Sequence, residues 1–187
     1  MVSTLTPPLT LEEFLQQPET KPASEYIDGK IIQKPMSGGE HSAIQGDLVS
    51  FINAELRSKK IARAFPELRC IFGGRAIVPD VSVYTWERIP RKENGEVGGV
   101  VAIAPDWLIE ILSPEQSQTK VIKKIVHALK YDTQMGWLIN PYEESVLVYS
   151  PNQPTEIFDE PDLILPVPEF AKELELSVGN LFAWLLE

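Results

Sequence analysis

The sequence predicts an α/β fold in which a mixed central sheet is flanked by helices, and it predicts that residues 1–187 form a single domain. The chain has 187 residues, 43% of them hydrophobic and 24% charged, which is enough for one sizeable core. Short apolar stretches typical of strands alternate with segments of helical periodicity. The 16 prolines and 11 glycines divide the chain into short elements, which favours strands and loops over a helical bundle.

The first third of the chain predicts a short helix, a hairpin and a long helix. Thr10 and Glu13 have the spacing of a capping box, so they predict an N-terminal helical lead-in. An Asp-Gly pair between apolar stretches predicts a hairpin over residues 26–33. Apolar residues recur at helical spacing over residues 41–56.

The remainder predicts strands, one internal helix and one terminal helix. The strand-like stretches are residues 62–72, 76–84, 107–112, 136–139, 145–149 and 163–165. Helices are expected over residues 120–131 and 178–186, with Ser177 as the N-cap of the second. The polar residues 89–99 predict a mobile loop.

Charge is distributed unevenly around a formal net charge of -10. Residues 57–130 contain 13 basic and 8 acidic side chains, whereas residues 143–187 contain 10 acidic and one basic. The middle of the chain is therefore able to present a positive face, while the C-terminal helical tail is acidic. A solvated surface with random clustering explains the same counts, so charge alone leaves nucleic acid open as a partner.

Several protein classes are disfavoured by what the sequence lacks. The single cysteine, Cys70, excludes an internal disulfide framework and a multi-cysteine zinc site. No apolar run approaches the roughly 20 residues of a membrane span, and residues 1–8 lack the features of a secretory signal. We therefore expect a cytoplasmic protein without a membrane partner.

Two carboxylates stand inside apolar stretches. Glu110 lies within residues 107–112, and a buried unpaired carboxylate costs several kcal/mol, so a protein cation or a metal is the expected partner. Alternatively, the strand alternates and Glu110 simply faces water or a lysine. Asp80 lies in the stretch 76–84, where Pro79 indicates an edge, a bulge or an irregular strand. Two carboxylates on adjacent strands offer the hard oxygen ligands that suit Mg²⁺.

Three lysines, Lys120, Lys123 and Lys124, stand near the start of the predicted helix 120–131. A lysine beside a metal-bound water orients that water or stabilises the charge that develops on a phosphate. A solvated helix face is the alternative, and it is the stronger interpretation for at least two of the three.

Further candidates stand upstream, near a helix start and a hairpin. Glu40 and His41 open the long helix, and Glu25 precedes the hairpin. Glu40 and His41 are first residues that suit a helix start and second candidates for a metal ligand or a phosphate contact.

Five short motifs occur in a fixed order over residues 25–148. They are Glu25-Tyr26-Ile27-Asp28-Gly29, Glu40-His41, Pro79-Asp80-Val81, Glu110-Ile111-Leu112-Ser113-Pro114 and Trp137-Leu138-Ile139-Asn140-Pro141. This order resembles the bacterial Uma-two family, long catalogued as a domain of unknown function and described as endonucleases. It is similar in turn to the PD-(D/E)XK, or restriction-endonuclease-like, superfamily.

The resemblance implies a restriction-endonuclease-like fold and phosphodiester hydrolysis that depends on Mg²⁺, with Mn²⁺ as an alternative. Asp80 matches the aspartate of the PD half and Glu110 the glutamate of the (D/E)XK half, 30 residues later. The superfamily's usual lysine position is Leu112 here. In the family that lysine has moved to the next helix, where Lys124 matches it and Lys120 is the alternative. The resemblance further implies Glu40 as a metal ligand, with Glu25 and His41 in accessory roles.

The leading hypothesis is therefore a nuclease that acts on nucleic acid, with DNA as the first expectation. Basic residues over the range 57–63 would hold the backbone in a salt-sensitive manner; they are Arg57, Lys59, Lys60 and Arg63. A homodimer is a further expectation, with residues 181–186 as a candidate surface and core packing as the competing explanation. The rival hypotheses are an inactive module that binds nucleic acid or protein, and a protein-interaction domain whose acidic segment 143–187 forms the contact.

Overall fold

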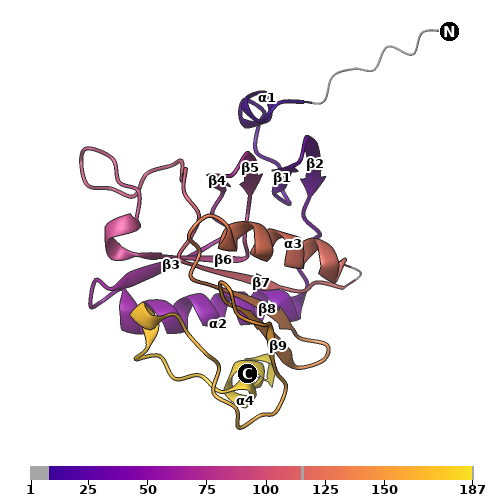
Figure 1. Cartoon of the computed structure of the whole chain (residues 1–187), viewed down its shortest axis with the longest axis vertical. Helices are drawn as coiled ribbons and strands as arrows, with labels where there is room; N and C mark the ends of the chain where they lie inside the picture. The colour runs from indigo at the N-terminus through magenta and orange to yellow at the C-terminus, as the bar shows by residue number, and fades with distance from the viewer. Residues whose placement is uncertain (1–8, 115, 187) are drawn as a thin grey trace, which may run out of the picture.

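Two sheets and the helices around them form the structure, a computed structural model that describes residues 9–114 and 116–186 (Figure 1). The larger sheet has the strand order β10-β9-β8-β7-β6-β3. Its strands are β3 (Ala62–Pro66), β6 (Val81–Thr85), β7 (Trp107–Ile111), β8 (Met135–Asn140), β9 (Ser145–Tyr149) and β10 (Glu156–Phe158). Since β7 and β8 are parallel and the other pairs antiparallel, the sheet is mixed, as predicted.

The smaller sheet has the order β2-β1-β5-β4. Its strands are β1 (Ser24–Ile27), β2 (Lys30–Gln33), β4 (Cys70–Phe72) and β5 (Arg75–Ile77). The helices are α1 (Leu11–Leu15), α2 (Gly39–Leu56), α3 (Gln118–Leu129) and α4 (Val178–Ala183), with 3₁₀ turns η1 (Trp86–Arg88), η2 (Glu169–Ala171) and η3 (Trp184–Leu186). Residues 1–8, which are expected to lack a secretory signal, lie outside the described residues.

Local sequence signals are confirmed where the predicted contacts are short-range. Thr10 and Glu13 form both hydrogen bonds of the capping box at the start of α1. The β1–β2 hairpin turns at Asp28 and Gly29, whose φ angles of 51° and 79° are those of the predicted two-residue turn. Ser177 accepts a hydrogen bond from the Asn180 N–H at 3.1 Å, which makes it the N-cap of α4.

The predicted strands 62–72 and 76–84 are wrong as single elements, because each divides between the two sheets. β3 ends at Pro66, and Glu67 then adopts a φ of 46°, so the chain turns away before β4. Between β5 and β6 the chain leaves the small sheet through residues 78–80 and enters the large one. Both strands therefore switch sheets where a proline interrupts the backbone ladder.

The C-terminal region also differs from prediction. Residues 163–165 form no strand; Ile164 makes a single bridge to Ser177. The strand that was missed is β10, an edge strand of three residues, which is too short to show an alternating pattern. The predicted helix 178–186 ends at Ala183 and continues as the η3 turn.

Helices cover both faces of the large sheet, with α2 on one side and α3 on the other (Figure 1). Along β7, Trp107, Ile109 and Ile111 pack on the α2 side, whereas Leu108 packs on the α3 side. Strand periodicity therefore directs Glu110 towards α3. The layer on the α2 side also includes buried C-terminal residues: Leu165, Ala171, Leu174, Leu176, Val178, Leu181 and Phe182.

The acidic C-terminal segment is thus part of the core. In the candidate dimer segment 181–186, Leu181 and Phe182 are buried and Leu186 is exposed. In the described part of the chain, no helix combines the length and apolarity needed to cross a bilayer.

Candidate active site

The two candidate carboxylates meet across neighbouring strands. β6 and β7 are antiparallel with Val81 opposite Ile109, and one further step in this register places Asp80 opposite Glu110. Both are buried, with 2% and 1% of their surfaces exposed. The Ile111 N–H donates to Asp80 Oδ2 at 2.7 Å, which fixes the aspartate to β7.

Asp80 owes its position to the irregular stretch that Pro79 predicts. Val78 lies outside the strands, so its backbone groups bond to side chains. Its N–H donates to Glu25 Oε1 at 2.8 Å, and its carbonyl accepts from Lys34 Nζ at 2.9 Å. These bonds tie the link between β5 and β6 to the first hairpin.

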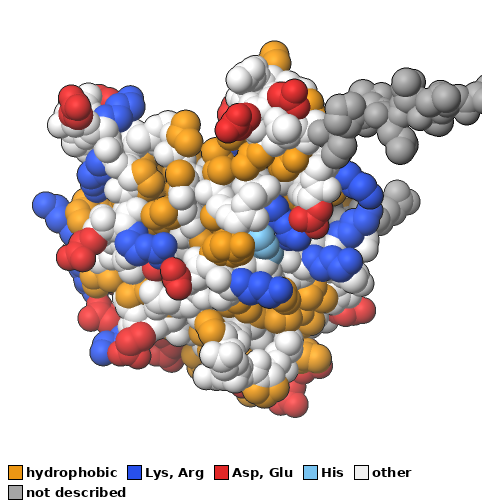
Figure 2. Space-filling model, turned by 45° about the horizontal axis from the view of Figure 1, so that its top comes forward, with side chains coloured by type: hydrophobic (Ala, Val, Ile, Leu, Met, Phe, Trp, Pro, Cys, Tyr) orange, Lys and Arg blue, Asp and Glu red, His pale blue; other side chains and the backbone are white. Residues whose placement is uncertain are grey.

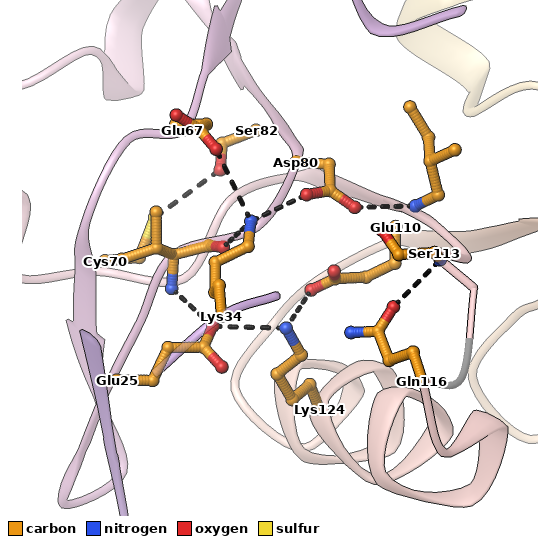
Figure 3. Close-up of polar contacts among 12 residues, drawn as sticks. Glu25, Lys34, Glu67, Cys70, Asp80, Ser82, Glu110, Ser113, Gln116 and Lys124 are labelled. Carbon is orange, nitrogen blue, oxygen red and sulfur yellow. Dashed lines mark hydrogen bonds and ion pairs between the residues drawn. The ribbon is translucent and has the colours of Figure 1, made fainter. Parts of the chain in front are cut away.

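Lys124 is the lysine that reaches the carboxylates. Its Nζ lies 2.9 Å from Glu110 Oε1 and 3.1 Å from Glu25 Oε1, and its side chain is buried (Figure 3). Lys120, one turn earlier on α3, is exposed on the rim of the adjacent groove. The structure therefore joins β1, β7 and α3 through Lys124.

Lys34 is the site residue that sequence reasoning missed. Its Nζ lies 2.6 Å from Asp80 Oδ1, and only 7% of its side chain is exposed (Figure 3). His41 Nε2 approaches the same oxygen at 3.1 Å from the start of α2. A lone lysine directly after a hairpin carries no chemical signal, because only tertiary packing brings residue 34 to residue 80.

The structure does not bring the remaining candidates to this cluster. Glu40 is exposed. The pKa of Tyr142 is raised mainly by the burial of the Tyr142 hydroxyl and secondly by the negative charge of Glu40. Arg57 lies sixteen residues beyond His41, a rise of about 24 Å along a helix. Lys59 is paired with Glu55 and Glu173 at 3.3 and 2.6 Å. Arg57, Lys59 and Lys60 therefore follow the C-terminal end of α2, and Arg63 lies on β3.

The two carboxylates have opposite electrostatic environments. Burial raises the pKa of Glu110 above its usual range, although Lys124 opposes the shift. Burial acts in the same direction on Asp80, but the His41 hydrogen bond and the Lys34 charge together hold the pKa of Asp80 well below its usual range. Burial alone would lower the pKa of Lys124, yet Glu110 and Glu25 raise it, so this ammonium stays charged. Neighbouring acids whose pKa values are pushed apart are typical of catalytic sites.

The donor set suits a hard divalent cation that keeps part of its water shell. Mg²⁺ is commonly held by one or two carboxylates plus water and substrate phosphates. Among the residues that the structure describes, the buried Glu110 Oε1 accepts no hydrogen bond, and it forms an ion pair with Lys124. Across residues 9–114 and 116–186, no three His, Cys, Asp or Glu side chains converge on one point. The protein groups here that could contribute to such a site are therefore two carboxylates, Asp80 and Glu110.

A groove leads from solvent to this cluster between the β1–β2 hairpin and α3. It encloses ≈ 420 Å³, and its charged lining consists of Glu25, Lys34, Lys120 and Lys124. Ile27, Ile32 and other apolar side chains form the rest of its wall. Lys34 and Lys124 line the groove whereas Asp80 and Glu110 do not, so a ligand in the groove meets two ammonium groups first.

Comparison with known proteins agrees with this geometry. Residues 11–179 match the family model Uma2, described as "Putative restriction endonuclease". None of the curated proteins matches the chain. A solved structure, described as a putative nuclease belonging to DUF820 from Anabaena variabilis ATCC 29413, is similar with a TM-score of 0.94 and 64% sequence identity. The match covers 95% of this chain and 99% of the other.

The family match extends over both site strands, the helix that carries Lys124 and the hairpin that carries Glu25. The similar solved structure has the same mixed sheet flanked by helices. The chain belongs to the Uma2 family of restriction-endonuclease-like nucleases.

Proposed function

We propose that this protein is a nuclease that hydrolyses nucleic-acid phosphodiester bonds with the help of Mg²⁺ or Mn²⁺, and that DNA is its substrate. One observation carries the proposal. Asp80 and Glu110 stand opposite each other, both buried, with the Lys124 ammonium 2.9 Å from Glu110 at the end of an open groove. Membership of a family described as restriction endonucleases supports it.

Asp80 and Glu110 are the residues that would hold the cation. When bound, a divalent cation lowers the pKa of a water and polarises a phosphate. The Ile111 N–H and His41 keep the Asp80 carboxylate in one orientation. Such fixed geometry matters because a carboxylate that is already oriented needs no reorganisation during the reaction.

Lys124 supplies fixed positive charge beside the reacting phosphate. Glu110 and Glu25 hold its ammonium in place, so it stabilises the negative charge that develops on the phosphate oxygens. Lys34 presents a second ammonium at the same end of the groove. We assign Lys34 to binding of the scissile phosphate, and Glu25 to positioning of Lys124.

The test compares Asp80→Asn and Glu110→Gln with wild type. Asp47→Asn is the matched control, because Asp47 is an exposed carboxylate on α2. Titration calorimetry with Mn²⁺ and Mg²⁺ is run beside cleavage of supercoiled plasmid, single-stranded DNA and RNA. We expect both site variants to lose metal binding and to cleave at least about 100-fold more slowly, while the control matches wild type. Undiminished cleavage by the combined variant Asp80→Asn/Glu110→Gln would refute the assigned site.

A second candidate, a binding module without catalysis, is favoured by one specific observation. Lys34 and Lys124 already neutralise the two carboxylates from within the protein. In that case the chain retains nucleic acid in EDTA and cleaves none of the three substrates with either metal. That combined result would replace the nuclease proposal.

A further inference from the structure

The outer face of α3 carries a stripe of basic and aromatic side chains. Lys120, Lys123 and His127 lie on α3, and Lys130 and Tyr131 follow directly after its last residue; each lies three or four residues from another member of the set, the spacing of a single helix face. The opposite face is buried through Val121, Lys124, Ile125 and Ala128. Burial of one face thus forces the stripe outward, and α3 contains no acidic residue that would neutralise it.

The stripe is continuous with the groove of the candidate site. A second hollow, lined by Lys30, Arg75, Lys120 and Lys123, adjoins the first and shares Lys120 and Lys124 with it. Figure 2 shows Lys and Arg side chains gathered around histidine and hydrophobic side chains on this face. Arg75 is paired with Asp28 at 2.8 Å. Within the described part of the chain, the three outward lysines form no ion pair.

An aromatic cluster ends the stripe. The rings of Phe72 and His127 are stacked with centroids 5.3 Å apart, and His127 lies 4.9 Å from the Tyr131 ring. Gly73 supports Tyr131 closely, since a Cβ there would lie only 2.4 Å from the ring. Tyr131 nevertheless keeps 42% of its surface exposed. The result is a partly open aromatic platform at the C-terminal end of α3, where His127 lies about 10 Å along the helix from Lys120.

We propose that this face of α3 binds an unpaired nucleic-acid strand, with phosphates on Lys120, Lys123 and Lys130 and a base stacked on Tyr131. The strand then enters the groove in front of Lys124. A basic track with an aromatic platform is the arrangement that retains single strands without sequence preference. A duplex offers the same phosphates, but its base faces are hidden, so Tyr131 distinguishes the two. This inference rests on the proposed nuclease function, because it supplies the path of that enzyme's substrate.

The test measures binding by fluorescence anisotropy in EDTA, where no cleavage interferes. The probes are labelled oligothymidylate, oligouridylate and a DNA duplex of equal length. The variant Lys120→Ala/Lys123→Ala/Lys130→Ala is compared with Arg91→Ala/Lys92→Ala/Lys172→Ala, a matched triple that removes the same charge from other exposed positions. We expect the α3 triple alone to weaken binding and to reduce the salt dependence by about two in logarithmic slope.

Substitution at Tyr131 tests stacking separately from charge. Tyr131→Ala is expected to weaken single-strand binding by about 5- to 150-fold and to leave duplex binding unchanged, whereas Tyr131→Phe retains wild-type affinity. Melting temperatures of all variants confirm that they fold. Equal loss in both lysine triples, tighter binding of the duplex than of single strands, or no binding at low salt would overturn the inference.

The two oligonucleotides separate DNA from RNA as the source of the strand. Cleavage assays on the same variants separate this inference from the proposed function. Binding that depends on α3 without any cleavage would support the strand path and refute hydrolysis. Metal-dependent cleavage that no α3 variant changes would support hydrolysis and refute the strand path.

Discussion

Two carboxylates inside the protein bind the ammonium of Lys124, whereas Lys120 on the same helix is exposed. Removing one partner of a buried ion pair leaves uncompensated charge, so we predict that Lys124→Met lowers the free energy of unfolding by about 3–5 kcal/mol. Lys120→Met should change it by no more than about 0.5 kcal/mol. Urea denaturation in EDTA measures both values. Similar losses in the two variants would contradict the buried pairing.

Asp80 predicts a specific dependence of stability on pH. His41 and Lys34 overcome the effect of burial and hold the pKa of Asp80 below its unfolded value. A carboxyl of this kind stabilises the fold above its unfolded pKa, near 3.9, and loses that contribution as pH falls towards the folded pKa.

We therefore expect the stability difference between wild type and Asp80→Asn in EDTA to be constant near neutral pH and to shrink below about pH 4. Thermal melts across this range provide the measurement. Asp47→Asn, at an exposed position, should show no such convergence. A constant difference down to pH 2 would mean that Asp80 is not held ionised.

At the scale of elements, the packing of α3 on β8 fixes the position of Lys124. Gly136 in β8 lies directly under Ile125, and a Cβ at Gly136 would lie 2.3 Å from Ile125 Cγ2. That methyl group is attached at the branch point of its side chain and has little freedom to move. Any side chain at position 136 therefore pushes the whole helix away from the sheet.

We predict that Gly136→Ala lowers the free energy of unfolding by about 1–3 kcal/mol through overpacking. Ile125→Ala alone should cost about 2–5 kcal/mol, but the double variant should lose less than the sum of the two single losses, because the clashing methyl is absent. A double-mutant cycle in urea quantifies the coupling between the two positions. Additive losses would show that α3 accommodates the extra methyl without moving.

The passage of the chain from one sheet to the other is a feature that sequence patterns predicted only in part. Pro79 indicated an irregular strand, and the chain does leave one sheet near it, as it also does near Pro66. A proline in the sequence indicates where a strand is interrupted, but it does not indicate which sheet the chain enters next. Partner strands far away in the sequence decide that destination.

At the scale of the whole molecule, the acidic C-terminal segment closes the layer on the α2 side of the sheet. It buries seven apolar side chains, and the Trp137 Nε1–H donates to the Pro166 carbonyl at 3.0 Å. Each fully buried aliphatic or aromatic side chain contributes about 1.5–3 kcal/mol. Their sum is comparable with the entire stability of a typical domain, about 5–15 kcal/mol.

We accordingly predict that a chain ending at Glu160 shows no cooperative unfolding transition by circular dichroism. A full-length variant with Glu169→Gln, Glu173→Gln and Glu175→Gln should unfold cooperatively, because these side chains are exposed. A cooperative transition in the shortened chain would show that the segment is dispensable for folding.

The sequence by itself determined the features that depend on near neighbours or on regular repeats. These include the capping box, the Asp-Gly hairpin, the long helices and the mixed α/β architecture. It also indicated two carboxylates in apolar strands. Burying a charge is costly, so a charged residue within an apolar stretch is an informative exception.

Only the tertiary structure decided what surrounds those carboxylates. It selected Lys124 over Lys120, added Lys34, and left Glu40 and the basic residues 57–63 outside the cluster. The contact between Lys34 and Asp80 spans 46 residues, and no local pattern specifies a pairing over that separation. Helical and strand periods encode which face of an element is buried, whereas the packing of several elements at once decides which charges meet there.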